Sequence, residues 1–213
     1  MTDEKLDDVS AAVVRSGIVA ILRAPTADSF AAVADVLIGA GITALEVTLT
    51  SRGAIDALAG LRRQLPSTVA VGAGTVLTED DAKAAIDAGA AFLVSPVLDP
   101  SLVASTPVPF YPGTSSPTEI YEAYKAGAPL VKLFPAAGLG PRFLRDVRGP
   151  LPQINVMPTG GIKIEDIADW LFAGAKAVGI GSPLIGDAAQ GGSMKALAAR
   201  ARHAVSAVAF ARS

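Results

Sequence analysis

A repeated junction constrains this chain more than any other feature of its sequence. Four times, an alanine-glycine pair ends a helix-like segment and opens an apolar run: Ala40-Gly41-Ile42, Ala88-Gly89-Ala90, Ala126-Gly127-Ala128 and Ala173-Gly174-Ala175. Glycine just after a helix and just before a strand is the usual junction of an α/β unit. The chain is therefore expected to alternate helices and strands along its whole length.

Apolar runs placed around these junctions predict eight strands, at residues 18–23, 44–49, 69–73, 92–95, 108–111, 130–134, 155–158 and 177–180. Apolar spacing of three and four predicts helices between them, such as residues 27–38, 54–65, 80–88 and 164–173. Residues 5–15 predict one more helix, ahead of the first strand. Eight parallel strands close a (βα)8 TIM barrel, so we predict a single (βα)8 barrel domain over residues 1–213 with an extra N-terminal helix.

The same alternation could form a doubly wound open sheet, which is the main alternative fold. Such sheets often carry a glycine-rich dinucleotide fingerprint. Here Gly72-Ala73-Gly74 lacks a third glycine three residues later and an acidic residue at the expected distance. The sequence therefore favours the barrel.

Composition narrows the class of protein. With 213 residues and 51% hydrophobic content, the chain can bury a large core in one domain. The formal net charge is -2 and the basic residues are scattered, which argues against nucleic acid or an acidic membrane surface as a partner. Apolar stretches are too short to cross a bilayer, and no signal-type segment is present. We expect a cytoplasmic protein without membrane contact.

Residues that are missing or rare limit the chemistry. The chain has no cysteine and one histidine, His203, in an alanine-rich segment that predicts a terminal helix with His203 in solvent. Thiolate nucleophiles and cysteine-ligated zinc are excluded, and a Ser-His pair or a hydrolytic zinc site would need well-placed imidazoles. We expect no cofactor and no metal, with chemistry from Lys, Glu, Asp, Thr, Ser and backbone N–H groups.

Lys132 is the lysine with the most unusual surroundings. It lies in Leu130-Val131-Lys132-Leu133-Phe134-Pro135, with apolar residues on both sides. Burial would disfavour the ammonium and lower the pKa, which yields the free amine that attacks a carbonyl in a Schiff-base enzyme. The alternative is a lysine at a strand end whose amine reaches water along its own stem.

Glu46 is the matching acid on the second predicted strand. In Leu45-Glu46-Val47-Thr48-Leu49-Thr50, alternation places Glu46, Thr48 and Thr50 on one face, which would be the inside of a barrel. A carboxylate held there near a lysine can move protons at neutral pH. The alternative is a structural ion pair with Lys132 that has no part in catalysis.

The last two predicted strands end in small residues, Pro158-Thr159-Gly160-Gly161 and Gly179-Ile180-Gly181-Ser182. Their backbone N–H groups would be accessible, and Ser182-Pro183 predicts a short helix with a capping hydroxyl and a proline in its first turn. These are the strands whose loops bind phosphate in many barrels. The alternative is two ordinary turns that need glycine for positive φ.

An ordered set of segments resembles the KDPG/KHG aldolases, metal-independent class I enzymes that act on 2-keto-3-deoxy-6-phosphogluconate (KDPG) or 4-hydroxy-2-oxoglutarate (KHG). The segments run from the first strand to the last: Ile18-Val19-Ala20-Ile21-Leu22-Arg23, Leu45-Glu46-Val47-Thr48, Val71-Gly72-Ala73-Gly74-Thr75-Val76, Val94-Ser95-Pro96, Pro112-Gly113, Val131-Lys132-Leu133-Phe134-Pro135, Pro158-Thr159-Gly160-Gly161 and Gly179-Ile180-Gly181-Ser182. The resemblance implies a compact (βα)8 barrel that assembles as a homotrimer.

The resemblance also implies residue roles. Lys132 would form the Schiff base and Glu46 would act as the general acid and base. Thr75 would lie beside the keto-acid carboxylate, and the distal phosphate would be held by Gly160, Gly161 and Ser182, with Thr159 and Gly181 also in the substrate site. One branch of the family binds the carboxylate with an arginine four residues after the glutamate, where this chain has Thr50. Another branch resembles this chain in ending its first strand in arginine, which assigns the carboxylate to Arg23.

The implied reaction is reversible cleavage of KDPG to pyruvate and glyceraldehyde 3-phosphate, and of KHG to pyruvate and glyoxylate. The partners would be a small 2-keto acid and a phosphorylated aldehyde. Alternatives are an aldolase specific for the galactonate-derived keto acid (KDPGal), a phosphosugar isomerase or epimerase that uses Glu46 as carbon base, and a non-catalytic sugar-phosphate binding protein. The sequence leaves open the preferred substrate, its C4 stereochemistry and the need for phosphate.

Overall fold

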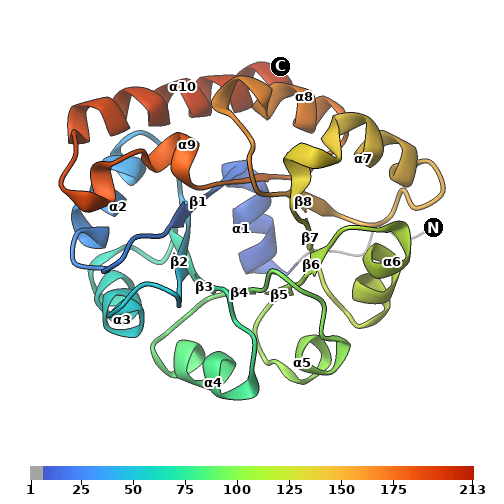
Figure 1. Cartoon of the computed structure of the whole chain (residues 1–213), viewed down its shortest axis with the longest axis horizontal. Coiled ribbons are helices and arrows are strands. Elements are labelled where there is room, and N and C mark those ends of the chain that lie inside the picture. Colours follow the sequence, from blue (N-terminus) through green and yellow to red (C-terminus); the bar gives the residue numbers. More distant parts are fainter. Residues whose placement is uncertain (1–6) are drawn as a thin grey trace.

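A computed structural model describes residues 7–213 of the chain (Figure 1). The strands are β1 (Ile18–Leu22), β2 (Ala44–Thr48), β3 (Ala70–Gly74), β4 (Leu93–Val94), β5 (Phe110–Tyr111), β6 (Gly113–Thr114), β7 (Val131–Leu133), β8 (Val156–Pro158) and β9 (Val178–Ile180). The α-helices are α1 (Asp8–Ser16), α2 (Phe30–Gly39), α3 (Ala54–Gln64), α4 (Glu79–Asp87), α5 (Pro100–Ser105), α6 (Pro117–Lys125), α7 (Gly140–Arg148), α8 (Ile167–Phe172), α9 (Ser182–Ile185) and α10 (Met194–Arg212). Short 3-10 turns cover Ala136–Gly138, Ile164–Asp166 and Ala188–Gln190.

All strand pairs within the two sheets are parallel. One sheet has the order β5-β4-β3-β2-β1-β9 and the other the order β6-β7-β8. The sheets meet where only Pro112 separates β5 from β6, and at a parallel bridge between Thr159 and Gly179. Helices surround the strands in Figure 1. The strands follow one another in chain order, and the last pairs with the first, so the described residues lack the reversal of order that marks a doubly wound sheet.

Alternate residues of each strand pack into two different clusters. Residues such as Leu45, Val47, Val131 and Leu133 belong to a large core that also includes the buried faces of the helices. The residues between them belong to a second, inner cluster, to which α1 adds Val13. Its other members are Val19, Ala44, Ala70, Phe92, Val94, Tyr111, Leu130, Met157 and Ala177. Side chains alternate along a strand, so the residues in these clusters also show on which face the remaining residues of the same strand lie.

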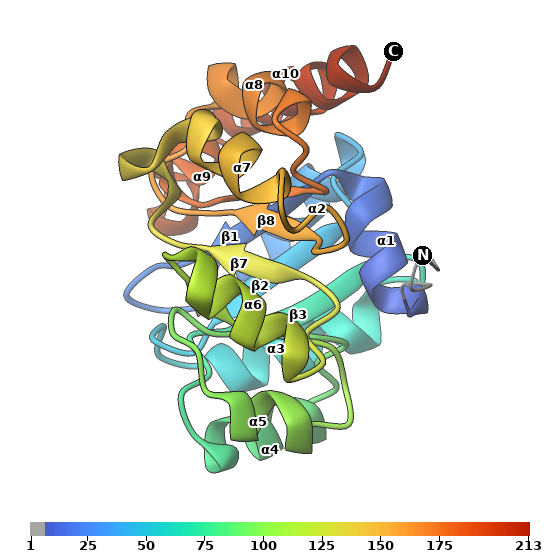
Figure 2. The same cartoon turned by 90° about the vertical axis from the view of Figure 1, so that its right-hand side faces the viewer.

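Helix α1 packs at one end of the inner cluster, and Figure 2 shows it at one end of the strands. Asp7 caps its first turn by accepting a hydrogen bond from the Ser10 N–H at 2.8 Å, and Gly17 ends it in the left-handed conformation. The buried Ser10 hydroxyl pairs with the Tyr111 hydroxyl at 2.9 Å. Val13 adds apolar contact, so α1 covers the amino ends of the strands and leaves the carboxyl ends for a site.

The predicted alternation of helices and strands is confirmed, and most boundaries differ by one to three residues. The fifth predicted strand, residues 108–111, corresponds to β5 alone, and β6 is an additional strand that was not predicted. Pro112 separates the two strands and has no N–H to donate to a neighbouring strand. The helix predicted from residue 5 is described from Asp8, and residues 5 and 6 lie outside the described residues. His203 is exposed on α10, as predicted. Within residues 7–213, no helix is long and apolar enough to span a membrane.

Candidate active site

Lys132 and Glu46 both lie on the inner face of the strands. Val131 and Leu133 belong to the outer core and Leu130 to the inner cluster, so alternation turns Lys132 inward on β7. The same pattern on β2 turns Glu46 inward between Leu45 and Val47. Ala44 and Leu130 lie two residues earlier on the chain and belong to the inner cluster, so Lys132 and Glu46 form the next layer toward the carboxyl ends.

The Lys132 side chain is buried in this layer, with only 4% of its surface exposed. Burial lowers the pKa of Lys132 below its ordinary value; the nearby Glu46 carboxylate opposes this shift and the Arg23 guanidinium adds to it. The Lys132 Nζ lies 5.0 Å from the centre of the Phe134 ring. The predicted burial of this amine is therefore confirmed. The alternative, in which the amine reaches open solvent, does not agree with this burial.

Glu46 is 1% exposed, and among residues 7–213 neither of its carboxylate oxygens has a hydrogen-bond partner. The ion pairs within the described residues join surface side chains, Lys83–Asp87, Lys125–Glu122 and Arg142–Asp146, and none joins Glu46 to Lys132. A buried carboxylate without partners is costly. Glu46 is thus not part of a close structural ion pair, and its oxygens are available to a bound molecule.

Arg23 follows the last residue of β1, and it is exposed although its neighbours on either side are buried. Hydrogen bonds from β2 and the turn after it hold the backbone on both sides of Arg23. The Thr48 hydroxyl donates to the Leu22 carbonyl at 3.0 Å, and the Ser51 hydroxyl accepts from the Ala24 N–H at 3.2 Å. This clamp was not predicted, because hydrogen bonds between separate turns leave no periodic signal in a sequence.

Thr75 follows β3 directly, at the carboxyl end of the strands, and it is half-buried. Its φ of 64° makes it the non-glycine residue with positive φ among residues 7–213. A β-branched residue in the left-handed region is strained by about 1–2 kcal/mol. Such strain is concentrated at functional sites, so the conformation points to a hydroxyl held for a purpose other than stability.

The glycine-rich turns lie side by side after β8 and β9, because the bridge between Thr159 and Gly179 joins their strands. Gly160 and Gly161 have φ values of 94° and 75°, which favour glycine. The prediction of a capping Ser182 hydroxyl was wrong: Gly181 takes the N-cap position of α9, Ser182 is its first residue, and no side chain caps it. A hydroxyl at that position does not reach the N–H groups that an N-cap residue binds.

The turns after β7 and β8 are tied together near Lys132. The Ala136 N–H donates to the Thr159 carbonyl at 2.8 Å, and the Ala137 N–H donates to the Gly160 carbonyl at 3.0 Å. The buried Thr114 hydroxyl donates to the carbonyl of Lys132 itself at 3.0 Å. Thr114 was not predicted either. These bonds fix the strand that carries the amine relative to the glycine-rich turns.

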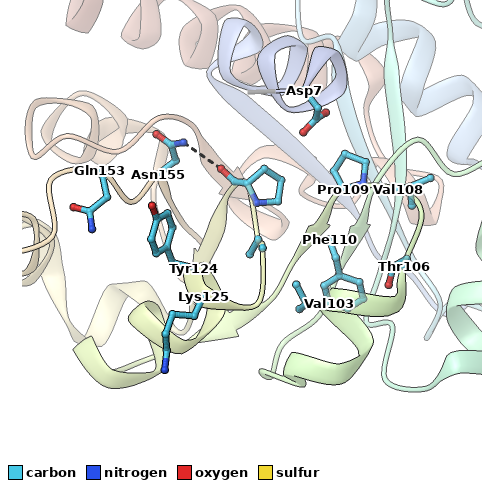
Figure 3. Close-up of a pocket in the computed structure, with 13 residues that line it drawn as sticks. Asp7, Val103, Thr106, Val108, Pro109, Phe110, Tyr124, Lys125, Gln153 and Asn155 are labelled. Carbon is cyan, nitrogen blue, oxygen red and sulfur yellow. Dashed lines mark hydrogen bonds between the residues drawn. The ribbon is translucent and has the colours of Figure 1, made fainter. Parts of the chain in front are cut away.

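A groove of about 680 Å³ lies at the opposite end of the molecule (Figure 3). Its lining includes Val108, Pro129 and Asn155, which come just before β5, β7 and β8. The Asn155 Nδ2 donates to the Pro129 carbonyl at 3.2 Å, and the Lys125 Nζ pairs with Glu122 at 2.8 Å. The hydrogen bond to Glu122 raises the pKa of Lys125. This groove contains none of the predicted site residues and offers no uncharged amine.

The residues at the carboxyl ends suit imine chemistry. They combine an amine whose pKa is lowered, a carboxylate with both oxygens available, a guanidinium, and glycine-rich turns with a nearby hydroxyl. An amine of this kind can add to a ketone, and the carboxylate can move protons. Among residues 7–213, no group of three or more His, Cys, Asp and Glu side chains is placed to hold a metal ion.

Comparisons with known proteins agree with this chemistry. The family model described as KDPG and KHG aldolase matches residues 9–198. The 2-dehydro-3-deoxy-phosphogluconate aldolase of Haemophilus influenzae is 37% identical over 158 residues, which cover 72% of this chain and 74% of that protein. A probable 2-dehydro-3-deoxy-6-phosphogalactonate aldolase of Rhizobium meliloti is 33% identical over 171 residues, which cover 78% of this chain and 81% of that protein.

A solved structure shares the fold. The KDPG aldolase of Legionella pneumophila, crystallised with pyruvate captured at low pH as a covalent carbinolamine intermediate, superposes with a TM-score of 0.84 at 28% sequence identity. The match covers 92% of this chain and 97% of that chain. The parallel α/β architecture is therefore that of a protein in which pyruvate bonds covalently.

Proposed function

The chain belongs to the KDPG and KHG aldolase family, and we propose that it is a class I aldolase that cleaves KDPG to pyruvate and glyceraldehyde 3-phosphate through a Schiff base on Lys132. The observation that carries this proposal is the buried Lys132 amine on the inner face, beside a Glu46 carboxylate without hydrogen-bond partners. Cleavage of KHG to pyruvate and glyoxylate would use the same groups.

The first half of the reaction builds an electron sink. The unprotonated Lys132 Nζ adds to the C2 ketone of the 2-keto-4-hydroxy acid and gives a carbinolamine. A proton from solvent joins the carbinolamine hydroxyl, which leaves as water, and a protonated imine remains. This cation withdraws electrons from C3, which is the polarisation that a bound metal supplies in other aldolases. The low-dielectric surroundings of Lys132 favour the neutral amine that starts this sequence.

The second half needs a base and then an acid, and we assign both roles to Glu46. Its carboxylate takes the proton from the C4 hydroxyl, directly or through one water molecule. The C3–C4 bond then breaks, its electron pair moves into the imine, and the aldehyde leaves while an enamine of pyruvate stays on Lys132. Glu46 returns a proton to C3, and hydrolysis of the resulting imine releases pyruvate.

We assign the substrate carboxylate to Arg23 and Thr75, which directly follow the carboxyl ends of β1 and β3. The clamp formed by Thr48 and Ser51 supports this role for Arg23, because it fixes the backbone from which the guanidinium extends. The strained backbone of Thr75 supports its role, because the fold maintains an unfavourable conformation there.

Replacing Thr75 by glycine is expected to raise KM for the keto acid about tenfold, which corresponds to one lost hydrogen bond to a charged group. The free energy of unfolding should change by less than about 1 kcal/mol, because relief of the left-handed strain offsets the added backbone entropy of glycine. Steady-state kinetics and urea unfolding measure the two quantities. An unchanged KM would contradict the role given to the Thr75 hydroxyl.

We place the distal phosphate at Gly160, Gly161, Gly181 and Ser182, with Thr159 behind them. The two turns lie together through the Thr159–Gly179 bridge, and the exposed Ser182 hydroxyl is not used in capping. Replacing Ser182 by alanine is expected to raise KM for KDPG about tenfold. The same change should leave KHG cleavage unaltered, because that substrate has no phosphate. Equal losses for both substrates would contradict this placement.

We also propose that the two sheets close into one (βα)8 barrel, with α1 as the extra N-terminal helix. Residues 1–213 would then form one domain. The Thr159–Gly179 bridge and the single inner cluster support closure. We also propose that the protein acts as a homotrimer in the cytoplasm, which light scattering and fractionation can test.

A substrate panel tests the proposed function directly. Purified protein incubated with KDPG, KDPGal and KHG should release pyruvate, with the highest kcat/KM for KDPG. A second candidate is an aldolase specific for KDPGal, which the Rhizobium meliloti relative favours. A highest kcat/KM for KDPGal would establish that candidate. Isomerised product without pyruvate would indicate an isomerase or epimerase, and binding without turnover a sugar-phosphate binding protein.

A further inference from the structure

Gly74 lies against the carboxylate of Glu46 on the neighbouring strand. The two strands are in parallel register, in which Glu46 is opposite Gly72 and Thr48 is opposite Gly74. Alternation on β3 places Ala70 in the inner cluster, so Gly72 and Gly74 also face inward. Both glycines are buried. Gly72 is therefore the glycine directly opposite Glu46. The Glu46 carboxylate nevertheless lies against Gly74.

A side chain at position 74 would occupy the space of this carboxylate. A Cβ atom placed on Gly74 would overlap Glu46 Oε1 and would lie 2.5 Å from Glu46 Cδ and 2.6 Å from Glu46 Cγ. The three nearest atoms all belong to Glu46, and none belongs to the backbone of another strand. Gly74 does not have a positive φ, so its backbone conformation is open to other residues.

We propose that Gly74 is a positioning residue for Glu46, because the absence of a side chain there leaves the space in which the Glu46 carboxylate lies. Gly74 is two residues nearer the carboxyl end of β3 than the residue opposite Glu46. The carboxylate thus leans over β3 toward the carboxyl ends of the strands, where the substrate would enter. This inference rests on the proposed function, since it gives Glu46 its direction toward C3 and the C4 hydroxyl.

The direct test is exchange of the pyruvate methyl protons with deuterated water, which requires the imine on Lys132 and then the proton steps assigned to Glu46. The Gly74→Ala variant is expected to exchange at least about tenfold more slowly than the wild type, because its carboxylate is displaced. Trapping of pyruvate on Lys132 by borohydride should still reach the wild-type extent. Gly60→Ala on α3 is the matched control, since nothing lies within 4 Å of its new methyl group, and it should exchange at the wild-type rate.

A double-mutant cycle separates positioning from a general structural effect. In a Glu46→Gln background, Gly74→Ala should lower the exchange rate by less than about threefold further, because the group it displaces is already inactive. If Gly74→Ala fails to fold, the Glu46→Ala/Gly74→Ala double variant must fold, since the colliding side chain is gone. A double variant that also fails to fold would overturn the proposal.

Gly72→Ala provides a contrast on the same strand. Its new Cβ would lie 2.5 Å from the backbone carbonyl oxygen of Phe92, which cannot move aside as a side chain can. Gly72→Ala should therefore lower the free energy of unfolding both with Glu46 and with its replacement at position 46. Wild-type exchange in Gly74→Ala, or an equal loss in both Glu46 backgrounds, would overturn the positioning role alone. A wild-type protein that neither exchanges nor traps pyruvate would instead defeat the proposed function and the inference with it.

Discussion

Replacing Lys132 by methionine is expected to lower kcat for KDPG cleavage by roughly 10⁴-fold or more, as loss of a covalent nucleophile does. Methionine keeps the length and fills the buried space on β7, but it has no amine to bond to C2. Coupled measurement of pyruvate release gives the rate. Lys125→Met is the matched control, because Lys125 is exposed in the groove at the amino ends, and it should retain wild-type kcat.

The Lys132→Met variant should have a free energy of unfolding about 1 kcal/mol larger than that of the wild type at neutral pH. Because burial lowers the pKa of Lys132 in the folded state, the unfolded chain binds more protons between that lowered pKa and the ordinary value of 10.5. The free energy of unfolding of the wild type therefore rises with pH through this window. The difference in free energy of unfolding between Lys132→Met and the wild type should become smaller over the same window. Urea unfolding at several pH values measures the difference. A constant difference would show that Lys132 does not titrate abnormally.

Replacing Glu46 by glutamine is expected to lower the rate of cleavage and of pyruvate proton exchange by about 10²–10⁴-fold, which is the usual contribution of a general acid and base. The amide keeps the shape of the side chain but cannot accept or return a proton. Rates of pyruvate release and deuterium exchange measure the loss. The fold should persist, because Glu46 makes no hydrogen bond among residues 7–213 that the amide would break.

Two controls accompany this variant. Glu165→Gln changes an exposed carboxylate and should retain wild-type rates. Borohydride should still trap pyruvate on Lys132 in Glu46→Gln, because the amine that bonds to the ketone is unchanged. Cleavage and exchange rates within about threefold of the wild type would assign the proton transfers to another group.

The sequence predicted the charged pair because alternation is a local property. The apolar residues on both sides of Lys132 and of Glu46 specify which face each occupies once the strands are identified. The αβ junctions at glycine identified those strands. Residues two apart on a strand share a face in any parallel sheet, so alternation indicates the inner face for both groups.

Other features depend on contacts between segments, which a single sequence does not specify. The space that Gly74 provides depends on the register between β2 and β3. The clamp on the backbone around Arg23 depends on where the turn after β2 meets the end of β1. Ser182 was placed at the wrong cap position because helix ends are set by hydrogen bonding, which propensity locates only within a few residues. The short strand β6 was missed because two residues after a proline carry no periodic signal.

Reduction with borohydride in the presence of pyruvate tests the central claim most directly. Peptide mapping of the treated protein should place the mass of one reduced pyruvate adduct on the peptide that contains Lys132, and the Lys132→Met variant should acquire none. An unlabelled protein, or an adduct on another lysine such as Lys163 or Lys176, would contradict the account.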